Sequence, residues 1–178
     1  MLSAGVIRLL FAPIRDRNLT MLMGMKEILL IEDTESDVRL LQRTLQALGI
    51  QNSIRHYARG SEALKYLAEL RAAGRVLPAI VVIDLKLPDI SGFEILAELN
   101  RSEFKSVLRI VVSQVEDLAS IKTAYSLGAH TFITKPATRE EFEELMKAYP
   151  EPWSRKAVRV PMGGPRSHRS RGGVGSPN

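Results

Sequence analysis

The chain of 178 residues contains no cysteine and only one tryptophan, and aromatic residues make up 6% of it. The absence of cysteine excludes disulfide bonds, zinc–thiolate sites and cysteine-based catalysis. No stretch reaches the roughly 18 consecutive apolar residues that a membrane-spanning helix needs. We therefore expect a cytoplasmic protein that does not act in a membrane. The apolar fraction of 45% and the charged fraction of 25% are typical of globular domains.

The net charge of +5 lies at the two ends of the chain rather than in its middle. Residues 1–24 carry a net charge of +2 and residues 151–178 one of +5, whereas residues 25–150 hold 16 basic and 18 acidic residues. A nucleic-acid-binding domain would concentrate positive charge on its folded surface. The distribution therefore argues against nucleic acid as a partner.

Composition divides the chain into three parts. Residues 1–24 hold an apolar stretch that charges and a proline interrupt, without a clear signal-peptide cleavage site; we interpret them as a disordered extension or as sequence upstream of the true start. The segment 150–178 is rich in Gly, Ser, Pro and Arg, which predicts a disordered basic tail and no output domain. The folded domain is expected at residues 25–149.

In that domain, short apolar runs alternate with amphipathic segments. The alternation predicts an α/β fold, a doubly wound parallel sheet of five strands flanked by five helices. The first, third and fourth runs are almost wholly apolar, as strands covered on both faces are. The expected strands are residues 27–31, 53–58, 79–84, 107–113 and 130–134, and the expected helices are residues 35–49, 60–74, 91–101, 116–128 and 138–149.

Polar residues stand where four of the expected strands end. The set consists of Glu32 and Asp33, Asp84, Ser113, and Lys135. In doubly wound sheets the carboxyl ends of the strands meet at one edge, and ligands bind there. We therefore expect three carboxylates, one hydroxyl and one ammonium group to form a single site.

The side chains of this expected site indicate magnesium and phosphoryl chemistry. Crowded carboxylates repel one another unless a cation balances them, and ligands that are all oxygen favour a hard cation such as Mg²⁺. An aspartate carboxylate can act as nucleophile and form an aspartyl phosphate. Lys135 could then offset charge on the transferred group, and Ser113 could donate a hydrogen bond to it.

Four segments resemble the receiver domain of two-component response regulators, the family of the chemotaxis regulator CheY. They are LLIEDTESD, VVIDLKLPDISGFEIL, IVVSQ and GAHTFITKPAT, within residues 26–149. The resemblance implies a CheY-like, flavodoxin-like fold with strand order 2-1-3-4-5. It also implies that Asp84 is the phosphoacceptor, which becomes 4-aspartylphosphate, and that the protein catalyses only its own phosphorylation and dephosphorylation.

The same resemblance implies a set of Mg²⁺ ligands. Asp33 and Asp84 would bind the ion directly, Glu32 indirectly, and Lys86 through its backbone carbonyl. Lys135 matches the family's phosphate-facing lysine, and its bond to the following proline is expected to be cis.

Ser113 and Phe132 match the two residues that change position when a receiver domain is phosphorylated. The phosphoryl donor would be a sensor histidine kinase or a phosphotransfer protein. Output would pass through the face formed by residues 116–149, where Ile121 and Tyr125 are candidates for contact with an effector protein or a second copy of the chain. The segments RAAGRVLP and EDTESDVRLLQ resemble stand-alone regulators partnered with bacterial phytochromes.

Two other functions fit parts of the sequence. A magnesium-dependent phosphatase with an aspartyl-phosphate intermediate would need a second aspartate two residues beyond the nucleophile, where this chain has Lys86. A pseudo-receiver that works without phosphorylation would lack part of the acidic site, which is complete here. A nucleotide-binding fold is disfavoured because neither GxGxxG nor GxxxxGK[ST] follows the first strand.

Several other residues have simpler structural interpretations. Ser91 and Thr138 are expected to cap the helices that follow them. Asp89 is expected to serve only the turn after the third strand, and Gly92 to relieve crowding at the start of the next helix. The three histidines, His56, His130 and His168, are expected at the surface without partners.

Overall fold

The structure, a computed structural model, describes residues 26–154 of the chain. The predictions for residues 1–24, for His168 and for the tail beyond residue 154 concern residues outside this part. Within residues 26–154, no helix combines the length and the apolar character needed to cross a membrane.

Every expected strand and helix is present, with each end within two residues of its expected position. A short 3₁₀ turn at Ser102–Phe104 was not predicted. The strands are β1 (Ile28–Ile31), β2 (Ile54–Tyr57), β3 (Ile80–Ile83), β4 (Leu108–Ser113) and β5 (Thr131–Thr134), and the helices are α2 (Glu35–Ala47), α3 (Gly60–Ala72), α4 (Gly92–Leu99), α5 (Leu118–Ser126) and α6 (Arg139–Ala148).

Helices α4 and α6 each begin just after a residue whose side chain caps the helix. The Ser91 side chain accepts a hydrogen bond from the backbone N–H of Phe93, and Thr138 forms a reciprocal capping box with Glu141. Such bonds satisfy N–H groups that have no partner within the helix. Both predicted N-caps are confirmed.

The five strands form one parallel sheet in the order β2-β1-β3-β4-β5. This confirms the doubly wound fold and its predicted strand order. The order reverses between β1 and β3, and Ile31 pairs there with Ile83. The residues that follow these two, Glu32 and Asp84, therefore leave the sheet side by side at the switch point, where ligands bind in such folds.

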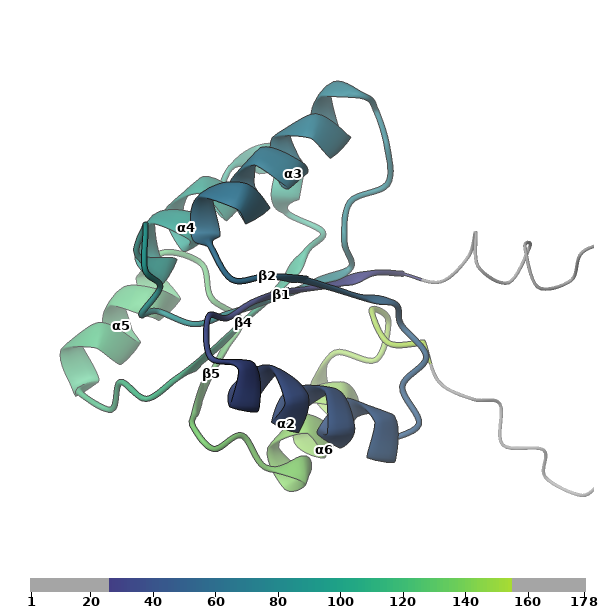
Figure 1. Cartoon of the computed structure of the whole chain (residues 1–178), viewed down its shortest axis with the longest axis vertical. Helices are drawn as coiled ribbons and strands as arrows, with labels where there is room; N and C mark the ends of the chain where they lie inside the picture. Colours follow the sequence, from purple (N-terminus) through teal and green to yellow (C-terminus); the bar gives the residue numbers. More distant parts are fainter. Residues whose placement is uncertain (1–25, 155–178) are drawn as a thin grey trace, which may run out of the picture.

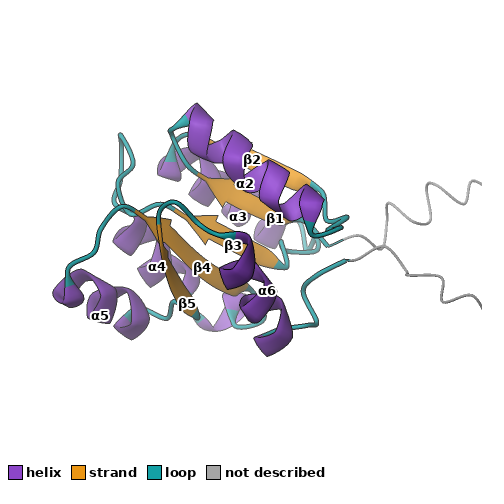
Figure 2. Cartoon of the chain, turned by 90° about the horizontal axis from the view of Figure 1, so that it is seen from below, coloured by secondary structure: helices purple, strands orange, loops and turns teal. Residues whose placement is uncertain are grey.

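Helices cover both faces of the sheet. As Figures 1 and 2 show, α2 and α6 lie on one face and α3, α4 and α5 on the other. The side chains of β1 alternate between two apolar cores: Ile28 and Leu30 pack toward α2 and α6, while Leu29 and Ile31 pack toward the opposite helices. Because both faces are buried, β1 and β3 carry only aliphatic residues.

The chain continues in contact with the domain beyond the predicted boundary at residue 149. Trp153 is 92% buried and meets the ring of Phe142 edge-on, with centroids 6.4 Å apart. The amide of Asn52 donates to the carbonyls of Lys26 and Pro152, at 2.7 and 3.0 Å, and accepts from the backbone N–H of Ser154. The prediction of disorder from Pro150 onward is therefore wrong for residues 150–154, because an apolar ring and an amide side chain fix them.

A buried arginine holds two helix ends at the amino edge of the sheet. Arg109, on β4, donates from Nε to the carbonyl of Gly128 at 2.6 Å and from a terminal nitrogen to the carbonyl of Leu99 at 2.8 Å. These carbonyls belong to the C-terminal ends of α5 and α4, where a cation is favourable. Burial lowers the pKa of Arg109.

The expectation that His130 lacks a partner is also wrong. Its Nδ1 accepts the backbone N–H of Arg109 at 3.1 Å. Burial, and then the charge of Arg109, lower the pKa of His130, which favours the neutral ring that this hydrogen bond requires.

Candidate functional site

The structure brings together all five residues expected at the carboxyl edge of the sheet. Glu32 and Asp33 follow β1, Asp84 follows β3, Ser113 ends β4, and Lys135 follows β5. The peptide bond between Lys135 and the next residue, Pro136, is cis as expected.

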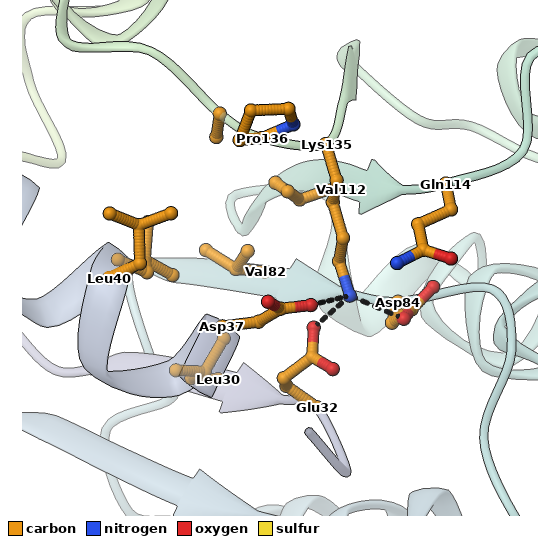
Figure 3. Close-up of a pocket in the computed structure, with 12 residues that line it drawn as sticks. Leu30, Glu32, Asp37, Leu40, Val82, Asp84, Val112, Gln114, Lys135 and Pro136 are labelled. Carbon is orange, nitrogen blue, oxygen red and sulfur yellow. Dashed lines mark hydrogen bonds and ion pairs between the residues drawn. The ribbon is translucent and has the colours of Figure 1, made fainter. Parts of the chain in front are cut away.

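Lys135 is the centre of the site. Its ammonium nitrogen lies 2.6 Å from a carboxylate oxygen of Glu32, 2.8 Å from one of Asp37 and 2.7 Å from one of Asp84 (Figure 3). Burial opposes the charge on Lys135, but its hydrogen bonds to Asp37, Asp84 and Glu32 outweigh burial and raise its pKa. The side chain therefore remains a cation at neutral pH.

Asp84 is buried and held by three donors. The Ser113 hydroxyl donates to Oδ1 at 2.6 Å, the backbone N–H of Lys86 donates to the same oxygen at 3.1 Å, and Lys135 donates to Oδ2. Ser113 itself is fully buried. The carboxylate thus has a fixed orientation, with one oxygen facing a hydroxyl and the other an ammonium group.

The acidic pair differs in exposure. Glu32 is buried and accepts the backbone N–H of Thr34, whereas Asp33 is exposed. Burial raises the pKa of Glu32, although hydrogen bonds from Lys135 and Thr34 act against it. Oxygens of Glu32, Asp33 and Asp84 lie within 4.8 Å of one another. A compact set of carboxylate oxygens without nitrogen or sulfur suits Mg²⁺, so these residues fit the predicted ion.

The sequence did not reveal the third acidic partner of Lys135. Asp37 lies in the first turn of α2, which begins two residues after the acidic pair. A helix that starts so soon after β1 places its first turn beside the carboxyl edge of the sheet. An acidic residue in that turn was the available signal.

Two cavities of similar size meet at Lys135. One, of about 210 Å³, opens over the carboxylates and is lined by Asp33, Thr34, Asp84, Lys86, Gln114 and Lys135. The other, of about 200 Å³, lies toward α2 and α6. Most of its lining is aliphatic: Leu30, Leu40, Leu41, Val82, Val112, Pro136 and Ala137. The polar lining residues are Glu32, Asp37, Asp84, Gln114 and Lys135.

The loop after β3 is held in place by close packing at Gly92 and by hydrogen bonds of Asp89. A Cβ atom on Gly92 would lie 2.3 Å from the carbonyl oxygen of Asp84, so only glycine fits there, as predicted. The carboxylate of Asp89 accepts the backbone N–H groups of Gly60 and Ser61, at 3.0 and 2.9 Å, and the Ser61 hydroxyl. These hydrogen bonds hold the pKa of Asp89 well below its usual range, and the bond from the Ser61 hydroxyl contributes most. Asp89 therefore caps α3 from a distant loop and is more than the turn residue we expected.

Two further residues connect the site with its surroundings. A ring nitrogen of His56 lies 2.7 Å from the backbone carbonyl of Glu32, so this histidine also has a partner, contrary to expectation. Phe132 is partly buried against the core beneath α3, α4 and α5, and its backbone N–H donates to the hydroxyl of Tyr125 at 3.2 Å.

Comparison with known proteins agrees with this geometry. The sequence model described as "Response regulator receiver domain" matches residues 28–147. Among curated proteins, the chain is 33% identical over 129 residues to the probable methanogenesis regulatory protein FilR2 of Methanothrix harundinacea, covering 71% of this chain and 82% of that one. It spans about half the length of some longer relatives, 47% in one case.

Two solved structures are also similar. The phosphorylated cyanobacterial phytochrome response regulator RcpA shares 30% identity at a TM-score of 0.60, covering 73% of this chain and 94% of that one. The Mn²⁺-bound response regulator Rcp1, a protein of Synechocystis, shares 24% identity at a TM-score of 0.60, covering 76% of this chain and 99% of that one.

Proposed function

The chain belongs to the response regulator receiver domain family, and on this basis we propose that it is a switch of a two-component system, phosphorylated on Asp84. The donor is a sensor histidine kinase or a phosphotransfer protein. The observation that carries the proposal is the position of Asp84, between the hydroxyl of Ser113 and the ammonium group of Lys135 and beside two further carboxylates.

The chemistry follows from the positions of these groups. An oxygen of Asp84 attacks the phosphorus of a phosphohistidine, and the new O–P bond forms as the P–N bond breaks. The imidazole leaves with the bonding electron pair and takes a proton. Lys135 and Ser113, which already contact Asp84, balance negative charge on the phosphoryl oxygens.

We propose that Asp33, Asp84 and the backbone carbonyl of Lys86 hold Mg²⁺ directly and that Glu32 does so indirectly. Bound there, the ion would neutralise part of the charge on the carboxylates and the phosphoryl group. Rcp1, which shares this fold, has a Mn²⁺-bound form, and this supports the binding of a divalent cation by this fold.

Ser113 and Phe132 are the proposed switch residues. Ser113 moves toward the new phosphoryl group, and Phe132 turns further into the core behind it. Phe132 is linked through its backbone to the half-exposed Tyr125 on α5, so its rearrangement reaches the surface of residues 116–149. Ile121 and Tyr125 on that surface would contact an effector protein or a second copy of the chain. The similarity to RcpA supports a phytochrome kinase as the cognate sensor.

Phosphorylation by a small donor tests the chemistry directly. The full chain is incubated with acetyl phosphate and Mg²⁺, and its intact mass is measured over time. We expect the mass of one phosphoryl group to be added, and neither Asp84→Asn nor the wild type in EDTA to gain it. A wild type that gains no mass, or an Asp84→Asn variant that gains as much as the wild type, would contradict the proposal.

A further inference from the structure

The three carboxylates that contact Lys135 are not equivalent. Glu32 and Asp84 belong to the group of oxygens that lie within 4.8 Å of one another together with Asp33. Asp37 is not part of this group in the described chain, although one of its oxygens lies 2.8 Å from the lysine nitrogen. Of the three partners, Asp37 is the one whose charge is directed at Lys135 and not at the proposed cation site.

Asp37 also approaches the ammonium group from a different direction. In Figure 3, Asp37 and Asp84 meet it from opposite sides, with Asp37 projecting from α2. Asp37 lines the aliphatic cavity toward α2 and α6 but not the open acidic cavity, which Lys135 and Asp84 line. The Asp37 side chain is 29% exposed, against 5% for Glu32 and 7% for Asp84, so water reaches Asp37 on the side away from the lysine, while the lysine itself is buried.

Phosphorylation changes two of the three contacts of Lys135. A phosphoryl group on Asp84 replaces the carboxylate charge that the lysine now meets, and a cation beside Glu32 competes for the charge of that residue. An ammonium group has three hydrogens to donate. Neither phosphorylation nor cation binding removes the bond to Asp37. The position of Asp37 is fixed in the first turn of α2, where the backbone N–H of Asp37 donates to the carbonyl of Thr34.

From this geometry we propose that Asp37 is a positioning residue for phosphoryl transfer, which keeps the ammonium group of Lys135 directed at the phosphoryl group. The inference rests on the proposed function. Asp37 touches neither the phosphorus nor the proposed cation and acts only through Lys135. Loss of its bond lets the lysine side chain move, and small displacements of a catalytic group lower rates steeply.

The first test compares variants of the full chain. Asp37→Ala removes both the charge and the hydrogen-bond acceptor, whereas Asp37→Asn keeps an oxygen acceptor. Glu35→Gln is the matched control, because Glu35 lies in the same helical turn, is largely exposed and faces Arg39. The measurements are the maximal rate of phosphorylation by acetyl phosphate at saturating Mg²⁺ and, without donor, the Mg²⁺ dissociation constant by calorimetry.

We expect Asp37→Ala to lower the maximal rate by about tenfold and Asp37→Asn by about threefold, because Lys135 is less well placed. The Mg²⁺ dissociation constant should change by less than about threefold, because the lost charge lies outside the carboxylate group that would bind the ion. Glu35→Gln should match the wild type in both. A rate for Asp37→Ala within about twofold of the wild type would overturn the proposal, as would an equal loss in Glu35→Gln.

The second test excludes a purely structural role. In a Lys135→Met background, Asp37→Ala should change the remaining rate by less than about twofold, because residues that act as one unit are not additive. The same tenfold loss in that background would show that Asp37 acts on the fold and not on Lys135. Failure of the wild type itself to be phosphorylated would instead contradict the proposed function.

Discussion

The two ends of the parallel sheet contain buried polar groups of opposite kinds. At the carboxyl end, Lys135 is bonded to the side chains of three acidic residues. At the amino end, Asn52 and Arg109 are bonded mainly to backbone groups. Side-chain partners can be exchanged for an incoming anion or cation, whereas backbone partners stay in place as long as the fold does.

This difference separates function from stability within one small domain. Bonds between crowded charges contribute little net stability, because the groups lose hydration and the like charges repel. Bonds from a buried side chain to helix ends leave carbonyls without partners when they are broken, which costs stability directly. We therefore expect substitutions at the carboxyl end to alter chemistry and substitutions at the amino end to alter folding.

The largest contrast should come from Asp84→Asn. Phosphorylation should be lost completely, because the amide is no nucleophile. The free energy of unfolding should stay within about 1 kcal/mol of the wild type, since the amide still accepts from Ser113 and lessens repulsion from Glu32. Urea unfolding of both proteins without Mg²⁺ checks this, and a loss of several kcal/mol would mean that the carboxyl end also holds the fold.

Trp153→Ala tests the amino end. Removing this buried ring from beside Phe142 should lower the free energy of unfolding by about 3 kcal/mol, while acetyl phosphate still phosphorylates the variant. Val76→Ala, at a position 86% exposed, is the control and should unfold like the wild type. If Trp153→Ala were as stable as that control, residues 150–154 would not belong to the folded domain.

Arg109→Met should have a somewhat smaller effect. The substitution keeps much of the apolar volume but leaves the carbonyls of Leu99 and Gly128 unpaired, so we expect a loss of about 2 kcal/mol in the free energy of unfolding. Arg101→Met, at an exposed residue paired with Glu98, should cost less than about 0.5 kcal/mol. Equal effects of the two substitutions in urea titrations would argue against the special role of Arg109.

Asp89→Asn should give the smallest effect, and one that depends on pH. The folded state holds the pKa of Asp89 well below its ordinary 3.8, so the charged carboxylate favours folding in full above that pH, and its contribution declines as the pH falls from 3.8 toward the lower pKa of the folded state. The urea midpoint of the variant should therefore lie below that of the wild type by a constant amount from pH 7 to pH 5, and the difference should begin to narrow, without vanishing, between pH 4 and pH 3. A difference that does not depend on pH would rule out the charge of Asp89 as its cause.

The sequence predicted the fold well because its signals are local. Apolar runs such as Ile80–Ile83 are too short for a helix and rich in β-branched residues, which favours strands buried on both faces. Gly49, Gly74 and Gly128, all with positive φ, mark where the amphipathic segments stop. Composition misled at Pro150, because residues 150–154 contain two prolines and a serine, residue types in which the basic tail is also rich. Their order comes from Asn52, about a hundred positions earlier in the chain, which no local pattern reveals.

Prediction of the site likewise succeeded where the signal is local and failed where a contact joins distant parts of the chain. Glu32, Asp84 and Lys135 each follow a strand directly, so the parallel topology alone was enough to bring them together. Asp37 was missed because its position depends on the helical phase of α2 relative to the sheet. The partners of Asp89 and His56 were missed because each contact joins segments far apart in sequence: Asp89 contacts the start of α3, and His56 on β2 contacts the carbonyl of Glu32.

The contacts of Asn52 also indicate where a label or a fused protein can be attached to the domain. One side chain bonds both to Lys26, where the described chain begins, and to Pro152 and Ser154, where it ends. The two junctions therefore lie next to each other, at the pole of the domain opposite Asp84. A fluorescent label, a surface tether or a fused protein attached at either junction would leave the acidic cleft open to a kinase.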